Sequence, residues 1–185
     1  MTSTKNSAVC KIWRHSTPWA QEAIAALSGQ GVIAGRDARS FAPGETVTRA
    51  EMIKILLLAT GKAPEANAES GFLDVAPEAW YAPYIAAARK LGLAQGTEDG
   101  YFMPEAQVTR QDLAVLLYRA FSMTEGGETL AFADGDSVAG YAETAVSFLV
   151  EKGIIQGVGD NQFAPLASAT RAQAALMVYR AQQAQ

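Results

Sequence analysis

Three arginines could do chemistry because of where they stand. Arg49, Arg110 and Arg171 each directly follow a threonine, at the expected first position of a helix. The helix dipole is positive at that end, so a cation there is unfavourable by roughly 0.3–1 kcal/mol. A guanidinium beside free helix amides would favour a carboxylate or phosphate on a ligand. The pattern predicts anion sites, and pairing of each arginine with a carboxylate of a neighbouring segment stays an open alternative.

Three aromatic residues accompany the arginines at a constant distance along the chain. Trp19, Trp80 and Tyr141 stand at the expected starts of other helices. As core residues they need no function, whereas in a groove an aromatic face packs well on the apolar C–H face of a sugar ring. Both interpretations are open. An arginine beside an aromatic residue is a suitable pair for an acidic sugar.

The sequence shows no arrangement typical of catalysis or of metal binding. His15 and Cys10 are the single histidine and cysteine of the chain, too few for a zinc site or a disulfide. Asp134-Gly135-Asp136 lacks the remaining ligand positions of a calcium loop, and no glycine-rich phosphate loop is present. No pair of acids has a spacing that marks glycoside hydrolysis. We therefore expect no catalytic residue, no metal and no cofactor.

Composition narrows the classes of partner. Hydrophobic residues make up 49% of the 185-residue chain and charged residues 18%, which is typical of a folded core. The net charge is −4 and no basic stripe is present, which argues against nucleic acid as a partner. Apolar runs such as Ile55 to Ala59 are far short of the roughly 20 residues of a membrane helix. We expect no membrane insertion.

The whole chain is organised as an internal repeat. The Thr-Arg pairs begin at positions 48, 109 and 170, which gives a period of 61 residues. The same offset relates three glycines, three phenylalanines, three prolines and the aromatic residues: Gly31, Gly92 and Gly153; Phe41, Phe102 and Phe163; Pro43, Pro104 and Pro165; Trp19, Trp80 and Tyr141. This agreement indicates three copies of one structural unit.

Each copy is predicted to form two helices around a loop of fixed length. The first helix begins near the aromatic residue and ends at a glycine that suits a left-handed C-terminal cap. The second begins at the threonine, and Thr48 with Glu51 three residues later makes a capping box. The second helices are apolar on nearly every face, which is typical of burial. We predict an all-α fold with a central bundle of three helices and approximate threefold symmetry.

The motifs resemble those of the S-layer homology (SLH) domain family. Its repeat reads Phe-x-Asp, Trp-Ala, Gly-Ile-x-x-Gly, Phe-x-Pro and Thr-Arg-Ala-Glu. The second and third copies contain Phe72-Leu-Asp74, Trp80, Gly92-Leu-Ala-Gln-Gly96, Phe102-Met-Pro104 and Thr109-Arg110-Gln111-Asp112, then Phe132-Ala-Asp134, Tyr141, Gly153-Ile-Ile-Gln-Gly157, Phe163-Ala-Pro165 and Thr170-Arg171-Ala172-Gln173. The first copy contains Trp19-Ala20, Phe41-Ala-Pro43 and the full Thr48-Arg49-Ala50-Glu51. The resemblance extends over residues 12–182.

The resemblance implies three tandem SLH repeats in a three-pronged spindle. We expect an N-terminal segment at 1–16, then repeats at 17–62, 72–124 and 131–182, together forming one module. It also implies an extracellular location in the cell wall or S-layer, as part of a larger surface protein. Non-covalent binding of a secondary cell-wall polysaccharide that bears pyruvate ketals is the implied function. The ligand-binding residues carried over by position are Arg49, Arg110, Arg171, Asp74, Asp134, Trp19, Trp80 and Tyr141.

The copies depart from the family pattern in unequal ways. The first has Ile12-Trp13-Arg14-His15 where Phe-x-Asp is expected, and the last glutamate of the motif is Asp112 in the second and Gln173 in the third. We expect unequal grooves between the repeats, with one or two occupied. We also expect alanine in place of the arginines to cost little stability. A scaffold that binds or assembles with other surface proteins is the alternative function.

Overall fold

The computed structural model describes residues 17–37, 40–64, 69–127 and 130–185. This part is all-α, as predicted, with no strand beyond isolated bridges. Its helices are the short 3₁₀ turn η1 (Pro18–Ala20), α2 (Gln21–Gly29), α3 (Arg49–Ala59), α4 (Ala82–Lys90), α5 (Arg110–Ala120), the 3₁₀ turn η2 (Gly135–Ser137), α6 (Gly140–Glu151) and α7 (Arg171–Gln183). The expected N-terminal segment, with Cys10 and His15, lies outside the described residues.

Three helices begin at the threonines of the repeat. The Thr48 side chain accepts from the Glu51 amide, and the Glu51 carboxylate accepts from the Thr48 amide, which completes the predicted capping box. Thr170 and Gln173 form a second such box. Thr109 also accepts from the Asp112 amide, but the shorter Asp112 side chain bonds the threonine hydroxyl instead. These caps set the first residue of α3, α5 and α7.

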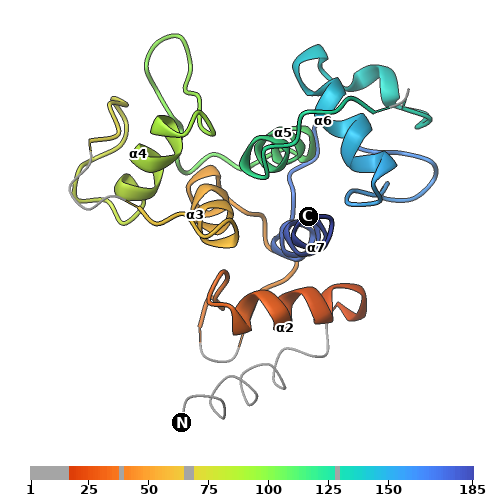
Figure 1. Ribbon diagram of the computed structural model, residues 1–185, viewed down its shortest axis with the longest axis horizontal. Coiled ribbons are helices and arrows are strands. Elements are labelled where there is room, and N and C mark those ends of the chain that lie inside the picture. The colour runs from red at the N-terminus through yellow and green to blue at the C-terminus, as the bar shows by residue number, and fades with distance from the viewer. Residues whose placement is uncertain (1–16, 38–39, 65–68, 128–129) are drawn as a thin grey trace.

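The three threonine-capped helices lie together at the centre of the molecule. Figure 1 shows α3, α5 and α7 side by side and nearly end-on, with α2, α4 and α6 around them in three separate prongs. All three pairs among the central helices are in contact. Each contributes fully buried side chains to the hydrophobic core, among them Leu56, Leu117 and Val178. The predicted spindle with a central three-helix bundle is therefore present.

Helix packing crosses the boundaries of the sequence repeats. The outer helix α4 packs on α3 of the repeat before it, and α6 packs on α5 in the same way. The outer helix of the first repeat, α2, packs on α7 of the last repeat and closes the circle. Each prong is thus built from the second helix of one repeat and the first helix of the next.

Backbone hydrogen bonds close a ring where the three repeats meet. The Val47 amide donates to the Ala169 carbonyl at 3.1 Å, Val108 donates to Val47 at 3.1 Å, and Ala169 donates to Val108 at 2.8 Å. All three residues are fully buried, so each of these bonds satisfies polar groups that water does not reach. The ring places the N-termini of α3, α5 and α7 beside the loops of neighbouring repeats.

Candidate functional site

Each arginine of the repeat extends into the loop of another repeat. The Nε atom of Arg110 donates to the Phe163 carbonyl and its Nη2 atom to the Gln156 carbonyl, each at 2.8 Å. The guanidinium carbon lies 5.0 Å from the centre of the Phe163 ring, in a cation–π arrangement. Only 2% of Arg110 is exposed. The side chain therefore links α5 to the loop of the third repeat.

The other two arginines make the same contacts. Arg49 donates from Nε to the Phe102 carbonyl at 3.0 Å and from Nη2 to the Gln95 carbonyl at 3.2 Å. Arg171 donates from Nε to Phe41 at 3.0 Å and from Nη2 to Ala34 at 2.7 Å. The contacts run from the first repeat to the second, the second to the third and the third back to the first. Burial lowers the pKa of all three guanidinium groups from its ordinary value.

The helix amides beside the arginines are occupied. The Arg110 amide donates to the Ala167 carbonyl at 2.9 Å and the Gln111 amide to the Pro165 carbonyl at 3.1 Å. The third amide of α5 donates to the Thr109 hydroxyl. Corresponding bonds occur at α3 and α7. The expectation of free amides facing a ligand is wrong, because loop carbonyls of the next repeat fill these positions.

The arginines are paired, but mostly with carbonyls rather than carboxylates. Among the described residues, the three arginines form one ion pair, between Arg171 Nη1 and the Glu51 carboxylate at 3.9 Å. Carbonyl oxygens carry a partial negative charge, so they offset the unfavourable position of a cation at a helix N-terminus. The alternative that the arginines pair with groups of neighbouring repeats therefore applies. Their partners are mainly backbone carbonyls and not the carboxylates that were expected.

The two aspartates shape the Phe-x-Pro loops. Asp74 accepts from the Phe102 and Met103 amides, both at 2.7 Å, and Asp134 accepts from the Phe163 and Ala164 amides, both at 2.8 Å. Met103 has a φ of 61° and Ala164 a φ of 55°, a left-handed conformation that non-glycine residues rarely adopt. Each carboxylate therefore stabilises a strained loop through two adjacent amides. The hydrogen bond from the Phe163 amide contributes most to lowering the pKa of Asp134.

The first repeat holds its loop with a local substitute. Ala42 has a φ of 54°, and its amide donates to the Ser40 hydroxyl at 3.1 Å. The Ser40 amide in turn donates to the Asp37 carboxylate at 2.8 Å. Residues 12–15, which stand in place of Phe-x-Asp, lie outside the described residues. The left-handed turn is therefore present in all three repeats.

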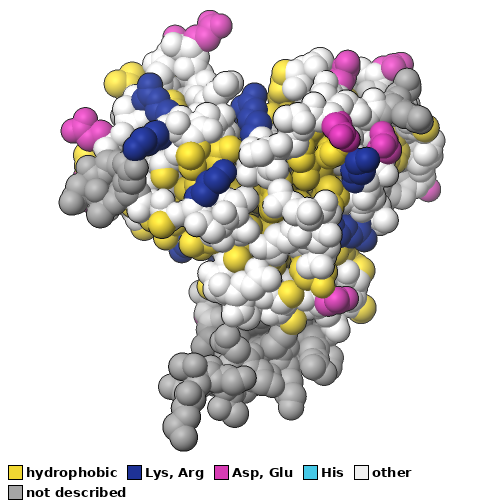
Figure 2. Space-filling model, in the orientation of Figure 1, with side chains coloured by type: hydrophobic (Ala, Val, Ile, Leu, Met, Phe, Trp, Pro, Cys, Tyr) yellow, Lys and Arg dark blue, Asp and Glu magenta, His cyan; other side chains and the backbone are white. Residues whose placement is uncertain are grey.

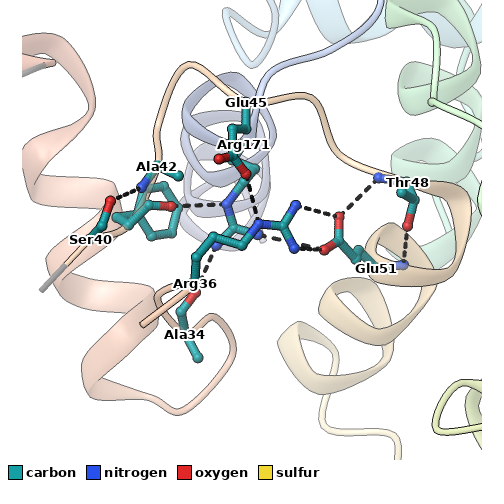
Figure 3. A network of polar contacts seen from close by, with 9 residues as sticks. Ala34, Arg36, Ser40, Ala42, Glu45, Thr48, Glu51 and Arg171 are labelled. Carbon is teal, nitrogen blue, oxygen red and sulfur yellow. Dashed lines mark hydrogen bonds and ion pairs between the residues drawn. The ribbon is translucent and has the colours of Figure 1, made fainter. Parts of the chain in front are cut away.

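A groove lies beside Arg171, between the loop of the first repeat, α3 and the segment that leads into α4. We name it the Arg171 groove. Its volume is about 220 Å³, and the residues that matter for its chemistry are Ile33, Arg36, Glu51, Lys54, Trp80 and Arg171. Figure 3 shows Arg36 and Arg171 converging on Glu51, which also caps α3 through Thr48. Arg36 pairs with Glu45 as well, at 2.8 Å. The hydrogen bond to Glu51 is the main cause that raises the pKa of Arg36.

Lys54 is a groove residue that the repeat pattern did not single out. Its ammonium lies 5.4 Å from the centre of a ring of Trp80 and 5.6 Å from that of Tyr84. Trp80 is half exposed, at 51%. The signal in the sequence is a break in the pattern, because the period of 61 places Val115 and Leu176 at the equivalent positions. A search for positions that have similar residues in all three repeats therefore misses Lys54.

A second groove, here the Arg110 groove, lies beside the loop of the third repeat. Its volume is about 320 Å³, and Trp19, Arg110, Gln173, Leu176 and Arg180 are among the residues that line it. Trp19 is 54% exposed, and it occupies the position that Trp80 has in the Arg171 groove. The structure thus brings a tryptophan and an arginine of the repeat together in each of these two grooves.

The corresponding place beside Arg49 is bridged by side chains. The Tyr141 hydroxyl donates to Asp112 at 2.7 Å and accepts from Gln111 Nε2 at 3.1 Å. The Gln111 side chain also accepts from the Ala139 amide, at the start of α6. The pKa of Tyr141 is raised to about 12, chiefly by burial of the hydroxyl and next by its hydrogen bond to Asp112. These contacts tie the start of α6 to the start of α5, and they make this place different from the two grooves.

The described surface combines basic and apolar groups near the prongs. Figure 2 shows Lys and Arg side chains beside exposed hydrophobic surface, between and on the two upper prongs. Within the described residues no group of three or more His, Cys, Asp or Glu side chains could hold a metal ion. Nor does the described part contain a helix with the length and apolarity needed to cross a membrane.

Three segments of the chain match the model of the S-layer homology domain, at residues 13–53, 71–114 and 131–175. The chain belongs to the S-layer homology domain family. These three matches coincide with the three helix–loop–helix repeats of the spindle. SLH domains are anchoring modules of S-layer proteins and cell-surface enzymes, which they attach to the cell wall. Membership indicates an extracellular location, in the cell wall or S-layer.

Relatives include both enzymes and S-layer proteins. The chain is 35% identical over 168 residues to exoglucanase XynX of Acetivibrio thermocellus, a match that covers 87% of this chain and 15% of that protein. It is 32% identical to the amylopullulanase of Thermoanaerobacterium thermosulfurigenes, over 87% of this chain and 9% of that protein. It is 31% identical to S-layer protein sap of Bacillus anthracis, over 86% of this chain and 20% of that protein. The SLH module thus spans a small part of these relatives.

Proposed function

We propose that this SLH module anchors a larger surface protein to the cell wall by non-covalent binding of an acidic wall polysaccharide. The ligand class is a secondary cell-wall polysaccharide whose sugars bear pyruvate ketals. The Arg171 groove is the observation that carries the proposal, because it combines basic side chains with the half-exposed indole of Trp80. Cations in a recessed site attract a carboxylate, and an indole beside them offers apolar contact to a sugar ring.

The predicted site residues have two kinds of role in this proposal. Trp19 and Trp80 contact sugar directly at the edges of their grooves. Arg49, Arg110 and Arg171 hold the loops that form the groove walls and add positive charge behind them. Asp74 and Asp134 shape the Phe-x-Pro loops, and Tyr141 takes the tryptophan position in the groove that is bridged. Two open grooves on one module would raise avidity for a polymer beyond that of either groove alone.

Sedimentation with purified cell walls tests the proposal. The chain is mixed with native walls and with walls from which mild acid has removed the pyruvate ketals. We expect the chain to sediment with native walls and to remain mostly in solution with the treated walls, since the ketal carboxylate is gone. Equal sedimentation with both would contradict recognition of an acidic sugar. Binding to neither would remove the anchoring proposal.

An exposed apolar patch on the second repeat favours the alternative of a protein-binding scaffold. Leu73, Met103 and Tyr101 are 74%, 51% and 45% exposed, and the Leu73 amide donates to the Gly100 carbonyl of the same loop region. Exposed apolar patches are typical of protein contacts. If the patch mediates self-assembly, Leu73→Glu lowers the sedimentation coefficient at high concentration and leaves wall binding unchanged. A monomeric wild-type chain would rule out self-assembly through this patch.

A further inference from the structure

Three basic side chains line the Arg171 groove, and two of them are already engaged. Arg171 donates to two loop carbonyls, those of Phe41 and Ala34. Arg36 bonds both Glu45 and Glu51 (Figure 3). A guanidinium that holds protein groups in this way has few donors left for a ligand, and its charge is partly balanced.

Lys54 is the third cation and differs from the other two. Among the described residues its ammonium makes no hydrogen bond and no ion pair, and its neighbours are the rings of Trp80 and Tyr84. An ammonium has three donors, and aromatic faces attract its charge without using them in hydrogen bonds to oxygen. The two rings therefore position the ammonium at the groove and leave its donors available.

The other grooves lack this arrangement. The positions equivalent to Lys54 are Val115 and Leu176. Leu176 lines the Arg110 groove, whose additional cation is Arg180. Arg180 lies in the last turn of α7 and donates to the Gly153 carbonyl at 3.4 Å. Among the described residues, Lys54 is thus the groove cation that lacks a polar partner.

We infer that Lys54 selects acidic over neutral sugars by binding the ligand carboxylate in the Arg171 groove. This inference rests on the proposed function and names the residue and the groove that recognise the acid. An ammonium–carboxylate hydrogen bond is charge-assisted, and a recessed groove screens it less than open water does. Trp80 and Tyr84 act as positioning residues for Lys54. Arg171 holds the wall of the groove and does not make the decisive contact.

Two small probes test the inference on the full chain. One is a methyl hexoside with a 4,6-O-pyruvate ketal, and the other is its uncharged methyl ester. We expect calorimetry to give wild-type chain a preference for the acid of about tenfold or more, as one charged hydrogen bond provides. Lys54→Met should remove that preference, and Lys54→Arg should retain most of it. Compared with the ester, the acid should further shift the indole N–H resonance of Trp80 and not that of Trp19.

Matched variants separate this effect from general changes in charge or fold. Lys152→Met is the control for loss, because Lys152 also lies beside an aromatic ring, 5.4 Å from Phe148, but lines neither groove. It should leave the preference unchanged. Leu176→Lys tests for gain, since it places an ammonium at the equivalent position of the Arg110 groove. We expect this variant to bind a second molecule of the acid probe, in the Arg110 groove. The acid should then also shift the indole N–H resonance of Trp19.

Three results would overturn the inference. They are a Lys54→Met chain that keeps the wild-type preference, a wild-type chain that has no preference, and an acid probe that moves the Trp19 resonance alone. If the chain still sediments with native but not ketal-free walls, the proposed function survives that failure. If the chain binds neither kind of wall, the proposed function has failed, and the inference fails with it.

Discussion

At the scale of single residues, Arg110 shows how a cation is accommodated at the start of a buried helix. Its two hydrogen bonds to carbonyls and its contact with the Phe163 ring replace the solvent that the guanidinium loses on burial. The planar fork of arginine fits two carbonyls at once, which a lysine cannot do. If Arg110 were replaced by alanine, the carbonyls of Phe163 and Gln156 would lose their hydrogen-bond donor.

Replacement of Arg110 should therefore destabilise the fold. We expect Arg110→Ala to lower the free energy of unfolding by about 3 kcal/mol, since each buried bond to a charged group contributes roughly 1.5–3 kcal/mol. Urea denaturation followed by circular dichroism measures the change. Arg119→Ala, in the last turn of the same helix, is the control and should stay within about 0.5 kcal/mol of wild type. A similar small effect of Arg110→Ala would restore the expectation that the arginine adds little stability.

Asp134 makes part of the stability depend on pH. Its folded pKa is lowered, mainly by the Phe163 amide, so its stabilisation is present above the unfolded pKa of about 3.9 and is lost as pH falls through the folded pKa. We expect Asp134→Asn to lower the melting temperature at neutral pH and to flatten its decline below about pH 4. Melting curves across this range check the prediction, with Asp136→Asn as control. If the melting temperatures of wild type and Asp134→Asn declined in parallel as pH falls, the prediction would be contradicted.

At the scale of the elements, residues at the ends of each helix determine where it begins and where it stops. Threonine caps begin α3, α5 and α7. The outer helices α2, α4 and α6 are followed by glycines in the left-handed conformation, as predicted, with φ between 68° and 73° at Gly31, Gly92 and Gly153. A side chain added at these glycines would meet no atom within 4 Å. The need for glycine is therefore a matter of backbone conformation and not of space.

Gly153 allows this distinction to be measured. We expect Gly153→Ala to lower the free energy of unfolding by about 1 kcal/mol, the cost of a left-handed conformation for an L-residue. Gly140→Ala, at the first residue of α6, is a matched control, because a side chain there also meets no atom within 4 Å but the φ of Gly140 is not positive. The control should be neutral or slightly stabilising. Equal losses for both variants would show that the left-handed cap is not the cause.

At the scale of the whole molecule, the three repeats form a closed circle rather than an open stack. Each outer helix packs on the central helix of the preceding repeat, and the last repeat completes the first through α7 and α2. The backbone ring of Val47, Val108 and Ala169 and the three arginine contacts follow the same circular order. No repeat contains its own complete prong, so the packing couples all three.

Removal of one repeat should therefore unfold the others. We expect the full chain to melt in one transition, with far-ultraviolet circular dichroism and tryptophan fluorescence coincident. A fragment of residues 1–128, which lacks α6 and α7, should show no cooperative transition, because α2 and α5 lose the helices that cover them. A fragment with its own sharp melting transition would show that two repeats suffice and that the closed circle is not required.

The sequence alone determined the features that depend on residues close together in the chain. The period of 61, the threonine caps and the glycine stops locate the second helices, the ends of the outer helices and the loops between them, because capping and left-handed turns involve neighbouring residues. The apolar faces of the second helices likewise predicted their burial, since burial follows from composition along one helix.

Only the tertiary structure decided which groups meet across the molecule. The sequence pattern is the same whether an outer helix packs on its own repeat or on the preceding one, so the crossed packing of α4 on α3 could not be deduced from it. For the same reason the sequence could not show the carbonyl partners of Arg49, Arg110 and Arg171. Nor could it show that Lys54 has aromatic rings and no polar partner among the residues that the structure describes. These contacts join residues far apart in sequence, and only closure of the circle brings them within hydrogen-bonding distance.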